Sequence, residues 1–204
     1  MDSFPPEMWD SILEFLHPEV LLKLAQISAY FVEIIVLNRS LRMRVFLFSS
    51  DMWEKDHNEQ LRWACKKGHL NVLRWLYSTF HLTREDARAN DNYALQMACQ
   101  NGHLEVCQWL HSTFHLTRED ARTWNNLALQ LACQGGHLEI LRWLHSTFNF
   151  TGEDARAMDN SALQWACQGG HLEILRWLHS TFNFTGEDAR AMDNSALQWG
   201  LLER

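Results

Sequence analysis

The chain has 204 residues, of which 47% are hydrophobic and 21% charged, and its net charge at neutral pH is −7. This apolar content supports packed structure and argues against a wholly disordered chain. Nucleic-acid binding needs a surplus of basic side chains, which neither the segment 1–56 nor the segment 57–204 has. The most apolar stretch, residues 31–48, contains four charged side chains, which argues against a membrane span. We therefore expect neither a nucleic-acid nor a membrane partner.

The cysteines favour a reducing compartment. No secretory signal follows Met1, because acidic residues interrupt the first apolar run. Stacked helices lie about 8–10 Å apart, whereas a disulfide needs Cα atoms within about 7 Å. Cysteines at equivalent places in stacked repeats are therefore expected to be reduced, buried and small apolar groups, as in the cytoplasm or nucleus. Four of the five cysteines recur at one fixed spacing: Cys65, Cys99, Cys133 and Cys167.

Residues 1–50 predict a module of three short helices. Pro5 and Pro6 suit the first turn of a helix, Pro18 restarts the chain, and Ser28 is a good N-cap for a third helix. Three such apolar helices cannot all face inward in so small a unit. The remaining apolar surface indicates a partner.

The run FPPEMWDSILEFLHPEVLLKLAQISAYF, residues 4–31, resembles an F-box. Phe4 stands where the pattern usually has Leu, and Ile27 where Val is commoner. The resemblance implies binding to the Skp-family adaptor of a cullin-based ubiquitin ligase. It places these residues at or near the contact: Phe4, Pro5, Ile12, Leu16, Leu21, Leu24 and Ser28. The alternative is a helical N-terminal cap that closes the end of a solenoid.

Residues 51–56 connect this module to an array over residues 57–204, and the apolar side chains that precede the connector predict that it is docked. Within the array, Ala166–Trp199 repeats Ala132–Trp165 letter for letter, at the same spacing as the cysteines. A fixed period of this length is typical of a helical solenoid, so we predict an all-α fold. The predicted units are 57–90, 91–124, 125–158, 159–192 and a partial unit, 193–204, in which we expect fraying.

Each unit predicts two helices and a short helical turn. In the fourth unit, Asp159 or Asn160 can supply the N-cap of the first helix, and Gly170 suits a left-handed turn that ends it. A second helix is predicted over residues 172–178, with a wide apolar face. Thr185–Asp188 then forms a capping-box signal for a third, short turn.

The run ALQWACQGGHLEILRWL, residues 162–178, resembles the core of an ankyrin repeat, and residues 94–110 and 61–76 are similar. Tetratricopeptide units have the same length, but their Trp, Gly-Tyr, Ala and Pro positions are not matched. The usual Gly-Ala-Asp-Val-Asn finger is replaced by Thr-x-Glu-Asp-Ala-Arg, which predicts a shortened or helical finger. An F-box in front of such repeats resembles proteins of large DNA viruses of amoebae, which implies the host cytoplasm for a viral protein.

No catalytic, cofactor or metal site is predicted, and we expect a protein that is not an enzyme. Each unit carries a Cys-x-x-x-His pair, but two ligands a repeat away from the next pair cannot build a tetrahedral zinc site. A Cys/His nucleophile would also lack an orienting third group. The repeated Glu-Asp pair suits the start of a helix better than acid–base catalysis. The tryptophans that recur with the repeat are interpreted as core between units.

A binding surface remains, and the positions that differ between units are its best guide. Identical units present identical surface, so the divergent first units carry the specificity. The residues predicted to bind an unknown protein target are Lys66, Lys67, Tyr93, Gln100, Asn101 and Trp124. The sequence thus predicts a substrate-recruiting adaptor of a Skp–cullin–F-box ubiquitin ligase. The alternative is an ankyrin-repeat scaffold or inhibitor with a helical N-terminal cap.

Overall fold

A computed structural model of the chain describes residues 16, 18–27, 52, 55–185 and 188. These residues form helices and contain no strand, which confirms the predicted all-α fold for this part of the chain. Helix α2, Pro18–Ile27, covers the second helix predicted in the N-terminal module. The predicted first and third helices, the connector except for Met52, Lys55 and Asp56, and the partial unit 193–204 lie outside the described residues.

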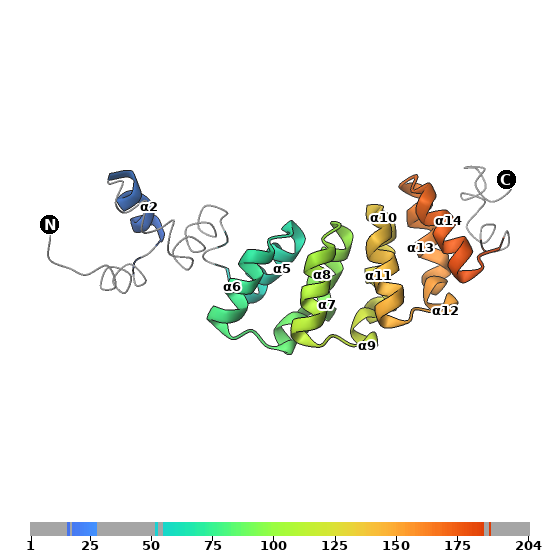
Figure 1. Cartoon of the computed structure of the whole chain (residues 1–204), viewed down its shortest axis with the longest axis horizontal. Helices are drawn as coiled ribbons and strands as arrows, with labels where there is room; N and C mark the ends of the chain where they lie inside the picture. Colours follow the sequence, from blue (N-terminus) through green and yellow to red (C-terminus); the bar gives the residue numbers. More distant parts are fainter. Residues whose placement is uncertain (1–15, 17, 28–51, 53–54, 186–187, 189–204) are drawn as a thin grey trace.

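The array consists of four helical pairs that stand side by side in chain order (Figure 1). We number them pair 1 to pair 4. The first helices are α5 His57–Lys67, α7 Arg84–Gln100, α10 Thr123–Gly135 and α13 Ala157–Gln168. The second helices are α6 Leu70–Phe80, α8 Leu104–Phe114, α11 Leu138–Phe148 and α14 Leu172–Phe182. Two short helices join consecutive pairs: α9 Arg118–Ala121 and α12 Gly152–Ala155.

The ends of the helices carry specific capping features. The side chain of Asp56 accepts a hydrogen bond from the Glu59 amide at 2.7 Å and so caps α5. Gly136 follows α10 in the left-handed region, with φ 79°, where a residue without Cβ has least strain. The second helices end one residue before another left-handed residue, which is His81 after α6 and Asn149 after α11. Each pair is therefore a helical hairpin with a defined start and end.

Stacking of the pairs builds one continuous core. Helix α7 packs between α5 and α10, and α10 packs between α7 and α13. The facing positions carry small buried side chains such as Ala64 and Ala98, which allow the first helices to approach closely. All five cysteines are buried and free, as predicted for the four at repeat spacing. Each fully buried leucine contributes about 2–3 kcal/mol from loss of contact with water, so the array depends on the stack.

An aromatic ladder joins the second helices. In pair 3, the rings of Trp143 and Phe148 meet edge to face, and His111 from pair 2 contacts both. Tyr77 makes the same two contacts with pair 2, and His145 makes them with pair 4. Trp109, Trp143 and Trp177 are partly buried and pack against the core, in agreement with their predicted role. The prediction is wrong for Trp165, which is 36% exposed. Its helix, α13, packs against α10, and the unit that would follow lies outside the described residues.

The segment between pairs differs from the prediction. The capping boxes at Thr83, Thr117 and Thr151 are present, and the segment is helical as expected. Three consecutive left-handed residues then form a turn inside each of α7, α10 and α13, and the regular part of the helix begins after this turn. The predicted N-cap at Asp159 or Asn160 is wrong, because both residues belong to this turn and Asn160 donates its side-chain amide across to Asp188 O, 3.3 Å away. The sequence offered no glycine as a signal for this turn.

Candidate functional site

The left-handed turns are the most unusual feature of the array. They comprise Asn90–Asn92, Trp124–Asn126 and Met158–Asn160, with φ between 53° and 67°. A left-handed conformation costs roughly 1–2 kcal/mol for each residue that carries a Cβ. Backbone strain of this kind persists only where surrounding contacts impose it, and it concentrates at functional positions.

Polar side chains hold each turn in place. In the second turn, Gln130 Nε2 donates to Asn125 O at 2.7 Å, and Gln96 makes the equivalent bond to Asp91 O. The third residue of each turn is a buried asparagine that reaches the next connection: Asn126 Nδ2 donates to Asp154 O at 3.1 Å. The second turn is thus fixed by one bond within its pair and one to the neighbouring pair.

The turns display large side chains to solvent. The first residue of the second and third turns is Trp124, 66% exposed, and Met158, 59% exposed. Tyr93, which directly follows the first turn, is 40% exposed. The side chain of Asn125 contacts the Met158 sulfur at 3.4 Å, so neighbouring turns touch. We call Tyr93, Trp124 and Met158 the turn row.

An ion-pair ladder accompanies the turn row. Asp120 is buried and receives Arg84 Nη2 at 2.9 Å and Arg88 Nε at 2.6 Å, both from the preceding connection. Asp154 pairs in the same way with Arg122. Each aspartate also completes its capping box, since the Thr117 amide donates to Asp120 Oδ2 at 2.8 Å. The repeated Asp and Arg therefore fix the spacing of the turns, a role that the sequence interpretation missed.

The charge of these carboxylates is stabilised by their neighbours. Burial on its own raises the pKa of Asp120, but hydrogen bonds from Thr117 and Arg84 outweigh it, and the net result is a pKa below the ordinary value. Burial also raises the pKa of Asp154 on its own, but hydrogen bonds from Thr151 and Arg122 outweigh it and lower the pKa. The ladder is thus held in its ionised form at neutral pH.

Four of the six predicted target-binding residues lie at the opposite end of the first helices. Lys66 and Lys67 are exposed in the last turn of α5. Gln100 ends α7, where its side chain donates to Gln134 Oε1 at 3.1 Å, and Asn101 donates to Met97 O at 2.8 Å. The amide group of Gln100 is therefore engaged with the next pair, and that of Asn101 with the end of its own helix.

The structure separates the six predicted residues into two groups. Tyr93 and Trp124 belong to the turn row, whereas Gln100 stands at the other end of the regular part of α7. With a rise of about 1.5 Å per residue, Tyr93 and Gln100 are roughly 10 Å apart along the helix. Met158 was not predicted, although it follows Trp124 by one period and is similarly displayed. Its place one repeat period after Trp124 is the only sequence signal that points to it.

The Cys-x-x-x-His pairs make structural contacts. The cysteines are in the core, whereas His103, His137 and His171 each place Nε2 at 3.0 Å from a backbone oxygen of the preceding pair. Burial, the largest cause, lowers the pKa of His137 despite its bond to Gln100 O. No group of three or more metal-ligating side chains occurs in the part of the chain that the structure describes. These histidines link neighbouring pairs.

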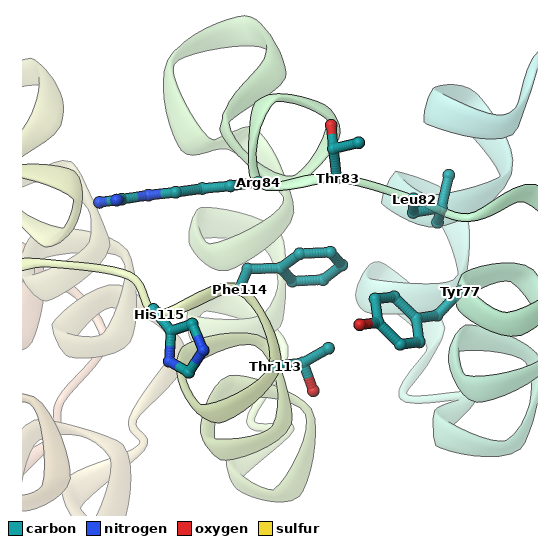
Figure 2. A pocket seen from close by; sticks show the side chains of 7 residues that line it. All are labelled: Tyr77, Leu82, Thr83, Arg84, Thr113, Phe114 and His115. Atoms are coloured by element: carbon teal, nitrogen blue, oxygen red, sulfur yellow. The ribbon is translucent and has the colours of Figure 1, made fainter.

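A shallow cavity of about 380 Å³ lies where α6 and α8 end (Figure 2). In Figure 2 the Tyr77 hydroxyl points towards the centre, and the Arg84 side chain extends away along the connection. Arg84 is engaged by Asp120. The lining residues are Tyr77, Leu82, Thr83, Arg84, Thr113, Phe114 and His115. None of the six predicted target-binding residues lines it.

The predicted adaptor-binding residues are described only in part. Leu21 is fully buried in α2, Leu16 is half-buried, and Leu24 lies in α2. Phe4, Pro5, Ile12 and Ser28 lie outside the described residues. The adaptor contact therefore stays a prediction.

Comparison with known proteins identifies the array. Residues 34–120, 61–154 and 112–193 each match the family model for ankyrin repeats in three copies. No F-box model matches the chain. No curated protein matches the sequence. Within residues 16, 18–27, 52, 55–185 and 188, none of the helices has the length and apolar character that crossing a membrane requires.

Proposed function

Because the chain belongs to the ankyrin-repeat family, whose arrays bind other proteins, we propose that its turn row binds a protein target and that residues 1–50 recruit a Skp-family adaptor of a cullin ubiquitin ligase. The chain itself would perform no chemistry in this role. It would raise the local concentration of the target's lysines near the conjugating enzyme. An ankyrin-repeat scaffold or inhibitor remains the alternative.

The exposure of Trp124 carries the target-binding half of this proposal. A tryptophan buries a large area on contact with a partner and is enriched among the residues that dominate interface energies. Here it is 66% exposed and stands in a strained turn that the side-chain bonds of Asn126 and Gln130 maintain. Met158 and Tyr93 extend the same row, which gives a partner several anchors.

Alanine substitution tests the two groups of predicted residues separately. One variant combines Tyr93→Ala and Trp124→Ala, and the other combines Lys66→Ala and Lys67→Ala. Gln100 and Asn101 are left intact because their side chains bond to the next pair and to the end of α7. We expect loss of target binding, by roughly tenfold or more, in the first variant. Unchanged binding in the first variant, with circular dichroism that matches the unaltered chain, would refute the turn row as the contact.

Copurification tests the adaptor half. The full chain is coexpressed with a Skp-family adaptor and compared with Leu16→Asp and Pro5→Ala. We expect a stable complex with the unaltered chain and none with Leu16→Asp. Failure of the unaltered chain to bind would leave the scaffold alternative, and a complex that survives in both variants would reject the residue assignment from the F-box resemblance.

A further inference from the structure

Two buried thiols face each other inside pair 2. Cys99 in α7 and Cys107 in α8 place their Sγ atoms 3.7 Å apart, and both side chains are completely buried. A disulfide has a sulfur–sulfur distance of about 2.05 Å. Side-chain rotation with a sulfur approach of roughly 1.7 Å would therefore bring these two atoms to bonding distance.

This pair of thiols breaks the repeat pattern. The position equivalent to Cys107 is a buried leucine in the other pairs: Leu73, Leu141 and Leu175. Cys65, Cys133 and Cys167 thus lie in pairs whose second helix has a leucine at this position. Among the described residues, only pair 2 combines both cysteines.

We propose that Cys99 and Cys107 are a disulfide-forming site, which closes when a peroxide or an oxidised small thiol reaches the opened second pair. With peroxide, one thiol attacks an oxygen atom, the O–O bond breaks, and a sulfenic acid and water form. The second thiol then attacks the sulfenic sulfur, the S–O bond breaks, and a second water leaves. Two thiols are oxidised by two electrons, and one peroxide is reduced to two waters.

Because both thiols are buried, oxidants reach them only after the array opens locally. Thiolates rather than thiols attack oxidants. The hydrogen bond with Cys107, together with burial, raises the pKa of Cys99 well above its ordinary value, and burial raises that of Cys65. In the closed array the buried Cys99 thiol is therefore inert, and the reaction follows local opening of pair 2. Once formed, the bond ties α7 to α8 and restricts further opening of the hairpin that carries Tyr93 and Gln100.

The test uses the full chain and a matched variant, Cys107→Leu, which restores the residue of the other pairs. Both proteins are reduced, freed of reductant and exposed to hydrogen peroxide across urea concentrations below the unfolding transition. Remaining thiols are then alkylated under denaturing conditions and counted by intact mass. The unaltered chain starts with five free thiols, and we expect it to lose two together as urea increases opening.

The position of the bond is read from proteolysis. Glu105 lies between the two cysteines, so cleavage after glutamate separates Cys99 from Cys107 unless a disulfide joins the fragments. We expect a joined pair of fragments in the unaltered chain, which reduction separates, and none in Cys107→Leu. A bond through Cys65 instead would overturn the proposal, as would oxidation to sulfinic acid without any bond or survival of all five thiols at the highest urea concentration. These outcomes do not depend on adaptor or target binding.

Discussion

At the scale of single residues, two glycines in the same backbone conformation have different surroundings. Gly136 and Gly170 both have positive φ, 79° and 68°, and both follow a first helix. A Cβ on Gly136 would lie 2.5 Å from the ring of His171, whereas a Cβ on Gly170 would meet no heavy atom within 4 Å in the part of the chain that the structure describes. The bond from His171 to the preceding pair therefore depends on Gly136, because a side chain at that position would occupy the space of the imidazole ring.

We therefore predict unequal costs for the same substitution. Gly170→Ala should lower the free energy of unfolding by about 1 kcal/mol, through backbone strain alone. Gly136→Ala should cost about 1–2 kcal/mol more, because the ring of His171 must move and its bond to Gln134 O is lost. Urea unfolding followed by circular dichroism measures both values. Equal losses would contradict the steric role of Gly136.

The buried carboxylate of Asp120 leads to a prediction with a pH dependence. Asp120→Asn removes the charge that faces Arg84 and Arg88 and should cost about 1–3 kcal/mol at pH 7. The pKa of Asp120 in the folded chain is below its ordinary value. Its contribution is therefore complete above about pH 4 and is lost as the pH falls through the folded-state pKa.

Unfolding titrations of both proteins between neutral and acidic pH measure this difference. The gap between the unaltered chain and Asp120→Asn should close below about pH 4. Glu153→Gln, which changes an exposed carboxylate in a similar connection, serves as the control and should leave the unfolding midpoint at neutral pH unchanged. A gap that persists at low pH would show that the ion pair is not its source.

At the scale of elements, the sequence predicted what local signals determine. The fixed period, the Gly-His steps and the threonine capping boxes located the helix pairs and their ends. The left-handed turn escaped prediction because its supports are distant in sequence: Asn126 bonds to the Asp154 carbonyl in the next connection. Arg84, a partner of Asp120, likewise comes from the connection one repeat upstream. Local propensity favours no such turn at Trp124, so only the stack can impose it.

The strained backbone at Trp124 predicts that its substitution by glycine and by alanine has different effects on stability. Glycine adopts a positive φ without the Cβ penalty, so Trp124→Gly should be more stable than Trp124→Ala by about 1 kcal/mol. Both variants should lose target binding, because both remove the exposed indole. Denaturant unfolding measures the first difference and a binding titration the second. If Trp124→Ala proved the more stable of the two, the turn would not be strained in solution.

At the scale of the whole molecule, cooperativity depends on contacts between neighbouring pairs. An array in which each pair touches only its neighbours behaves as a one-dimensional chain of coupled units. Pairs 2 and 3 are coupled by His111, which contacts Trp143 and Phe148, and by His137, which bonds Gln100 O. These two contacts join different parts of the same interface, so their combined loss weakens it while leaving each hairpin intact.

We predict that His111→Ala combined with His137→Ala divides the unfolding transition. An aromatic contact and a partly buried hydrogen bond together contribute about 1–3 kcal/mol, all of it at one interface. Urea unfolding monitored by circular dichroism and by tryptophan fluorescence should coincide for the unaltered chain and separate for the double variant, as the two sides lose their coupling. His179→Ala, at an exposed position equivalent to His111, is the control and should leave the two probes coincident. Coincident transitions in the double variant would mean that apolar packing of the first helices alone carries the coupling, since α7 and α10 remain in contact.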